Sequence, residues 1–144
     1  MNRNRGGVLR SANMPSSGIL SGITIVIVED YPDTLYGIAH FLTRHGAKVF
    51  VSPNASEGVQ AVREHRPDIV LSDIRLPKRD GFELLRNIRA LGPENGGNVP
   101  MIAMTAFGGF AARERMIAAG FQAHLDKPFA PDSLLEAIKS VLKN

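Results

Sequence analysis

Residues 23–30 read ITIVIVED, a short run of mostly β-branched aliphatic residues that ends on two acids. Polar and apolar residues do not alternate in it, which is typical of a strand covered on both faces of a sheet. Residues 68–73, DIVLSD, have the same form. Strands of this kind belong to parallel sheets, because the connecting helices pack on both sides. The two stretches together predict an α/β protein.

Strand-like and helix-like segments alternate from residue 23 to the end of the chain. Strands are predicted at residues 24–28, 47–51, 68–72, 100–105 and 122–125. Apolar residues spaced three and four apart predict helices at residues 33–44, 55–65, 80–91 and 110–120 and from Pro131 onward. Asp80 is the expected N-cap of the third helix, and residues 93–98 are an expected loop. Five strand–helix units in series predict one doubly wound five-stranded parallel sheet with helices on both faces.

The fourth predicted helix has the weakest apolar pattern, with Ala112, Met116 and Ala119 on its inward side. Gly108 and Gly109 precede it. The glycine pair can be an ordinary loop, or it can leave the helix free to shift, as a two-state switch requires. We favour the second interpretation.

The composition excludes several classes of protein. No apolar run approaches the ~20 residues of a membrane span, and the lack of cysteine excludes disulfides and thiolate chemistry and agrees with a cytoplasmic location. Arg3, Arg5 and Arg10 lie in residues 1–22, a predicted disordered basic leader. The other 14 Lys and Arg (17 minus 3) balance 14 Asp and Glu. Residues 23–144 are therefore predicted to form a nearly neutral domain that does not bind DNA directly.

Polar residues follow four of the predicted strands. They are Glu29 and Asp30, Ser72 and Asp73, Thr105 and Ala106, and Asp126, Lys127 and Pro128. The carboxyl ends of parallel strands meet at one edge of a sheet, where open α/β sheets place their sites. Each residue alone has an ordinary structural explanation, such as a helix cap or a solvated charge. Their common place at the strand ends favours a functional site.

Carboxylates gathered at one edge repel one another unless a cation joins them. Lys127 supplies one positive charge, and oxygen ligands without His or Cys favour Mg²⁺ for the remainder. Mg²⁺ beside a carboxylate and a lysine suits phosphoryl transfer, with Asp73 as the nucleophile. The Thr105 hydroxyl is expected to bind a phosphoryl oxygen. The backbone N–H groups of Ile74 and Ala106 are expected to bind others.

The order of these motifs resembles the response-regulator receiver family over residues 23–143. The resemblance rests on Glu29-Asp30, on Asp73-Ile-Arg-Leu-Pro77 with Gly81, on Thr105-Ala106 and on Lys127-Pro128-Phe129. It implies a flavodoxin-like sheet with strand order 2-1-3-4-5 and a receiver domain at residues 23–144. Residues 120–128 are most similar to receivers of hybrid sensor histidine kinases.

The resemblance also implies a role for each site residue. Asp73 would be the phosphoacceptor, and Thr105 and Lys127 would assist the transfer. The Mg²⁺ ligands would be Glu29, Asp30, Asp73 and the backbone carbonyl of Arg75. Thr105 and His124 would be the switch residues, although the family often has an aromatic residue at the position of His124. The Lys127–Pro128 peptide bond would be cis.

The function implied is that of a two-component signal receiver. A sensor histidine kinase or a histidine phosphotransfer protein would donate the phosphoryl group, and the receiver would then change its partner binding. Such a domain catalyses its own phosphorylation and dephosphorylation but is not a conventional enzyme, and a homodimer is compatible with it. With only Asn144 after the last helix, no DNA-binding output domain is expected. The alternative is a receiver-like module that takes no phosphate and acts only through protein contacts.

Overall fold

Five short aliphatic strands form one parallel sheet with the order β2-β1-β3-β4-β5 in the computed structural model. The strands are β1 Thr24–Val28, β2 Lys48–Ser52, β3 Ile69–Asp73, β4 Met101–Thr105 and β5 Ala123–Asp126. The structure describes residues 18–76, 80–106 and 108–143. The predicted strand number, direction and order are confirmed, and four strands begin one residue later than predicted.

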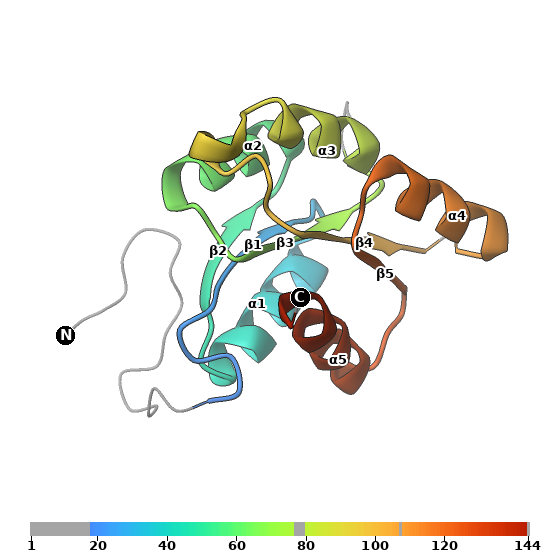
Figure 1. Ribbon diagram of the computed structural model, residues 1–144. Helices are drawn as coiled ribbons and strands as arrows, with labels where there is room; N and C mark the ends of the chain where they lie inside the picture. The colour runs from blue at the N-terminus through green and yellow to red at the C-terminus, as the bar shows by residue number, and fades with distance from the viewer. Residues whose placement is uncertain (1–17, 77–79, 107, 144) are drawn as a thin grey trace.

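Helices cover both faces of this sheet (Figure 1). They are α1 Pro32–Arg44, α2 Ala55–His65, α3 Gly81–Arg89, α4 Phe110–Ala119 and α5 Pro131–Leu142, and a 3₁₀ turn spans Pro93–Asn95 in the predicted loop. The Asp80 side chain accepts a hydrogen bond from the Glu83 N–H at 2.9 Å, which confirms the predicted cap of α3. No helix in the described part of the chain is both long and apolar enough to cross a bilayer.

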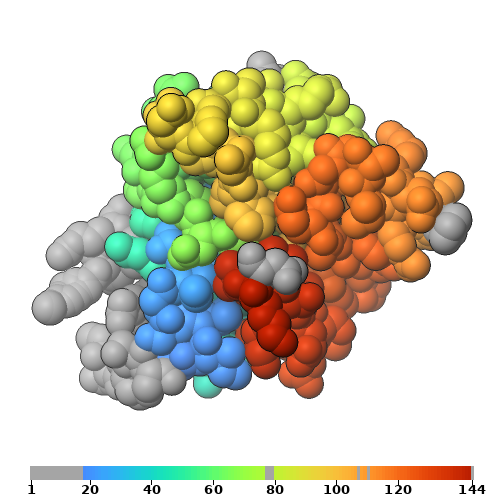
Figure 2. Space-filling model, viewed as in Figure 1, coloured from blue at the N-terminus to red at the C-terminus, as the bar shows by residue number. Residues whose placement is uncertain are grey.

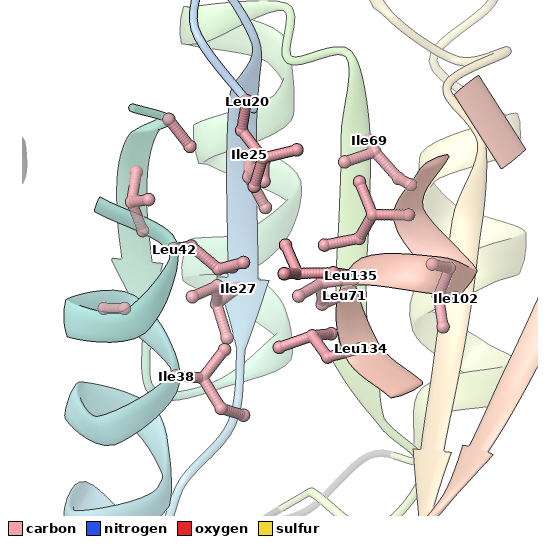
Figure 3. Close-up of a cluster of buried hydrophobic side chains, with 14 of the residues drawn as sticks. Leu20, Ile25, Ile27, Ile38, Leu42, Ile69, Leu71, Ile102, Leu134 and Leu135 are labelled. Carbon is pink, nitrogen blue, oxygen red and sulfur yellow. The ribbon is translucent and has the colours of Figure 1, made fainter. Parts of the chain in front are cut away.

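The strand residues point alternately into two hydrophobic clusters. Ile25 and Ile27 pack with residues of α1 and α5 on one face, in the cluster drawn in Figure 3. Val26 and Val28 pack with residues of α2, α3 and α4 on the other face. Because each face is covered, the inner residues of β1 to β4 are apolar in succession and show no alternation in sequence. In β5, at the edge of the sheet, Ala123 and Leu125 alternate with His124 and Asp126.

Helix α4 contributes least to these clusters. Among its described side chains Met116 is buried and Ala112 is partly buried. Ala119 is exposed, so its predicted inward position was wrong. The left-handed Gly120 ends the helix directly after Ala119. The prediction that α4 has a weak inward face holds for the rest of the helix.

The domain includes residues that precede residue 23. Leu20 is 1% exposed and belongs to the cluster with α1 and α5, and its N–H donates to the His45 carbonyl at 2.8 Å. Residues 18–22 therefore pack as a turn against the domain, which differs from the predicted leader boundary at residue 22. Figure 2 shows this turn in blue beside the red C-terminal end of α5. Residues 1–17 lie outside the described residues.

Thr43 in α1 offers a test of the packing. Its hydroxyl is buried and has no hydrogen-bond partner among the described residues. Replacing Thr43 by valine keeps the side-chain shape and removes the unsatisfied group. We expect the free energy of unfolding to rise by about 0.5–2 kcal/mol. Urea denaturation measures it, and a variant less stable than the parent would show that the hydroxyl has a partner in solution.

Candidate functional site

Three carboxylates meet at the carboxyl ends of β1 and β3. Glu29 and Asp30 follow β1, and Asp73 is the last residue of β3. Because Val28 lies beside Ser72 in the parallel ladder, β1 and β3 end side by side. One carboxylate oxygen from each acid lies within 4.8 Å of the others. Glu29 and Asp73 are buried and Asp30 is exposed, so the cluster opens to solvent on one side.

Lys127 brings a cation to this cluster from the end of β5. Its Nζ lies 2.6 Å from Glu29 Oε1 and 3.3 Å from Asp73 Oδ2. The Lys127 N–H donates to the Thr105 carbonyl at 2.7 Å, which ties the end of β5 to the end of β4. The Lys127–Pro128 peptide bond is cis, as the family resemblance implied. The ammonium group therefore bridges two acids that come from different strands.

Burial and mutual contact shift the pKa values of Glu29 and Lys127. Burial raises the pKa of Glu29 above its ordinary value, opposed by the hydrogen bonds from Lys127 and from the Tyr31 N–H, while the nearby Asp73 charge adds to the rise. Burial alone would lower the pKa of Lys127. The hydrogen bond to Glu29 and the charges of Asp73 and Glu29 outweigh it, so the net pKa of Lys127 is raised. Lys127 is therefore charged at neutral pH.

The donor set fits a divalent cation. When all three carboxylates are ionised, they and the one ammonium group leave a charge of −2 (−3 plus 1) at the cluster. All the candidate ligands are oxygens, which Mg²⁺ prefers over nitrogen and sulfur. One oxygen from each acid lies within 4.8 Å of the others, which is close enough for the three carboxylates to converge on one cation. The cluster can thus hold a metal ion.

The backbone after Asp73 is arranged differently from the prediction. The Ile74 N–H donates to the Met104 carbonyl at 2.9 Å, so it continues the β3–β4 ladder and is not available to a phosphoryl group. The prediction for Ile74 was therefore wrong. The next amide, that of Arg75, donates to Asp73 Oδ1 at 3.2 Å. Arg75 also pairs with Asp80 in an isolated β-bridge, and Pro77 lies outside the described residues.

Gly81 allows the start of α3 to approach the end of β3 closely. Its N–H donates to the Ile74 carbonyl at 2.7 Å. A Cβ at residue 81 would lie 2.7 Å from the Asp73 carbonyl oxygen and 2.9 Å from Ile74 Cα, which are backbone atoms. A side chain at this position must therefore push the backbone that carries Asp73 away from α3.

Replacing Gly81 by alanine is expected to disturb both stability and the site. Overpacking against the backbone should lower the free energy of unfolding by about 1–3 kcal/mol and slow any reaction at Asp73 by roughly tenfold or more, through misplacement. Gly37→Ala is the matched control, because no atom lies within 4 Å of a Cβ there. That substitution should stabilise α1 by about 0.5–1 kcal/mol. Equal behaviour of the two variants in urea denaturation would contradict the close approach at Gly81.

The two predicted switch residues lie on the side of the sheet that carries α4. Thr105 is 4% exposed and is aligned with Asp126 across the β4–β5 ladder. His124 is half-buried two residues before Asp126, and its Nε2 accepts a hydrogen bond from Arg113 Nε at 3.1 Å. The sequence analysis did not single out Arg113. No signal could have done so, because the pattern of α4 is too weak to assign its faces.

A groove of about 540 Å³ opens next to the cluster, between α1 and the start of α5. Lys127, which contacts Glu29 and Asp73, is one of its lining residues, and Ile38, Phe41 and Phe129 contribute apolar lining. The groove therefore connects the cluster with an apolar surface of the protein.

Comparisons with known proteins agree with this geometry. The family model described as "Response regulator receiver domain" matches residues 25–139. The polar-differentiation response regulator DivK of Brucella anthropi is 31% identical, covering 83% of this chain and 95% of that protein. An uncharacterized 14.6 kDa protein of Leptolyngbya boryana is 34% identical over 83% of this chain and 90% of its own length.

Solved structures give the same result. The receiver domain of the sensor histidine kinase PA1611 from Pseudomonas aeruginosa PAO1, with a magnesium ion in its active site cleft, is 34% identical with a TM-score of 0.76, covering 85% of this chain and 99% of that one. A CheY-like receiver domain protein from Methanospirillum hungatei is 30% identical with a TM-score of 0.75, over 84% and 94% of the two chains. The chain therefore belongs to the response-regulator receiver family of two-component systems.

Proposed function

We propose that this chain accepts a phosphoryl group on Asp73 and changes its partner binding in response. The observation that carries the proposal is the Lys127 ammonium group, which lies between Glu29 and Asp73 in a cluster of three carboxylates. A cluster with this excess of negative charge is costly unless it binds cations. A single lysine is insufficient, and a site for a divalent cation and a phosphoryl group accounts for the arrangement.

The proposed transfer uses residues at four strand ends. A carboxylate oxygen of Asp73 forms a bond to phosphorus, and the bond from phosphorus to the donor nitrogen breaks, with its electron pair left on the imidazole. Lys127 neutralises charge on the phosphoryl oxygens, and the Thr105 hydroxyl and the Ala106 N–H donate hydrogen bonds to them. The Ile74 N–H has no part in this scheme.

Mg²⁺ is the proposed cofactor. Glu29, Asp30 and Asp73 would hold it with their side chains, and the Arg75 carbonyl would be a further ligand. When bound, the ion supplies positive charge that offsets the charge of the phosphoryl oxygens. Glu29 must be ionised for this, and Lys127 supports the ionised form through their hydrogen bond.

The proposed donor is a phosphohistidine on a sensor histidine kinase or on a histidine phosphotransfer protein. Such a donor must present its imidazole beside Lys127, so its surface would cover the groove between α1 and α5. The apolar wall of that groove provides contact area for a helical partner. The domain itself would promote transfer and hydrolysis without being a conventional enzyme.

Incubation of the full chain with acetyl phosphate, a small phosphodonor, tests the proposal. With Mg²⁺ present, mass spectrometry of the intact protein should show the addition of one phosphoryl group, and a chelator should prevent it. A Mg²⁺ titration followed by a thermal shift reports metal binding separately. Metal binding without any mass gain would favour the alternative, a receiver-like module that works only through protein contacts.

A further inference from the structure

The described side chains of helix α4 make little apolar contact with the domain. Met116 is the buried residue among its described side chains, whereas α5 buries Leu134, Leu135, Ile138 and Val141. Figure 1 shows α4 in orange at the edge of the molecule, next to β5. A helix with so small an apolar face depends on individual polar contacts for its position.

One such contact joins α4 to β5. Arg113 Nε donates a hydrogen bond to His124 Nε2 at 3.1 Å. An arginine side chain has donors only, so the Nε2 atom of His124 must be the unprotonated nitrogen of its ring. A phenylalanine ring at position 124 would occupy similar space without an acceptor, so the bond depends on the histidine.

The loop before α4 also lies close to β5. A Cβ on Gly108 would overlap the carboxylate of Asp126, so the loop passes directly over that side chain. Leu125 packs into the cluster on the α1 and α5 side. Because strand residues alternate, His124 and Asp126 point to the opposite side, toward α4. Thr105 points the same way, since Ala103, two residues earlier, belongs to the cluster on that side.

We propose that Arg113 is a positioning residue of the switch, which holds α4 on β5 through His124. The Arg113 contact sits on the sheet face that also carries Thr105, so a movement of Thr105 or of the loop after it acts on the position of α4. Phosphorylation of Asp73 would then weaken the Arg113–His124 bond and loosen α4. This last step rests on the proposed function, whereas the bond itself does not.

Arg115 provides a useful contrast on the same helix. Its guanidinium group lies 4.9 Å from the ring centroid of Phe82, so it contacts α3. Removing the Arg113 bond should therefore loosen the side of α4 that faces β5 and leave the contact with α3 in place. Glu114, between the two arginines, is exposed and serves as the position for a matched control.

We call the Arg113–His124 hydrogen bond the latch. Hydrogen exchange of the α4 amides in the full chain, without any phosphoryl group, measures how firmly this bond holds α4. Arg113→Ala and His124→Phe should each speed exchange roughly threefold to tenfold, the effect of one ordinary hydrogen bond. The double variant should be no faster than the faster single variant. His124→Gln should restore slow exchange, because its amide oxygen can accept from Arg113, and Glu114→Gln should match the parent.

A second arm loads the protein with beryllofluoride and Mg²⁺. Loading should speed α4 exchange in the parent and have a smaller effect in Arg113→Ala. If both single variants exchange like the parent, or if their effects add in the double variant, the proposal that the latch holds α4 is wrong. If the parent binds neither beryllofluoride nor phosphate, the proposed function fails while the unloaded comparison still decides the latch. Urea denaturation of each variant separates local loosening of α4 from loss of the whole fold.

Discussion

Replacing Asp73 by asparagine is expected to abolish the mass gain that acetyl phosphate and Mg²⁺ produce in the parent protein. The amide oxygen of asparagine is a poor nucleophile, and among the described residues Asp73 is the acid that contacts both the Lys127 ammonium group and the Arg75 N–H. We expect the labelled fraction to fall by about hundredfold or more, in line with the loss of a covalent nucleophile. Mass spectrometry of the intact chain, followed by peptide mapping, measures it.

The control for this experiment is Asp132→Asn. Asp132 lies exposed in the first turn of α5 and is not one of the three acids of the cluster. The Asp132→Asn variant should be labelled like the parent. The Asp73→Asn variant should also bind Mg²⁺ more weakly, because one of the three carboxylates is gone. Labelling of Asp73→Asn at the parental level would place the phosphoryl group on another residue.

Replacing Lys127 by methionine is expected to impair both the fold and the transfer. The variant leaves Glu29, which is 1% exposed, and Asp73 without their shared cation. We expect a loss of about 1–3 kcal/mol in the free energy of unfolding without Mg²⁺, between the values for exposed and for buried ion pairs. The rate of phosphoryl transfer should fall about 10²- to 10³-fold, as when one donor to a developing charge is removed.

The stability loss of this variant should depend on pH. Burial already raises the pKa of Glu29, and removal of Lys127 takes away the hydrogen bond that opposes this rise. A carboxyl group whose pKa is higher in the folded than in the unfolded state binds protons more tightly when folded, so stability falls as the pH rises through that interval. The deficit should therefore be small in acid, where Glu29 is protonated, and reach its full size near neutral pH.

Urea denaturation of the parent and the variant across the acid-to-neutral range measures this difference. Lys48→Met removes a positive charge from an exposed position at the start of β2 and should stay within about 0.5 kcal/mol of the parent. A deficit in Lys127→Met that is constant with pH would mean that Glu29 is not the group left uncompensated. An unchanged transfer rate would remove Lys127 from the proposed mechanism.

Much of the fold could be predicted because its elements have strong local patterns. Residues 24–28 and 68–72 are mostly apolar runs of strand length, and α5 has Leu134, Leu135, Ile138 and Val141 on one side. The family resemblance added the strand order. Parallel strands then bring their carboxyl ends to one edge, so the meeting of Glu29, Asp30, Asp73 and Lys127 followed from topology alone.

Other features depended on contacts between residues far apart in the chain. The hydrogen bond from the Ile74 N–H to the Met104 carbonyl depends on how far the β3–β4 ladder extends, which a sequence pattern does not specify. The burial of Leu20 follows from its hydrogen bond to His45, across the α1–β2 corner. The adjacent apolar residues Ile19 and Leu20 show no period in a stretch of Ser and Gly, so the sequence pattern did not indicate that Leu20 is buried.

The sequence by itself determined the alternation of strands and helices and the residue types at the strand ends, because periodicity and polarity are local properties of the chain. The tertiary structure alone decided how those residues pair: Lys127 with both Glu29 and Asp73, and Arg113 with His124. Such pairs depend on distances of a few ångströms between separate elements. Those distances are set by how the helices pack on the sheet, which no local pattern records.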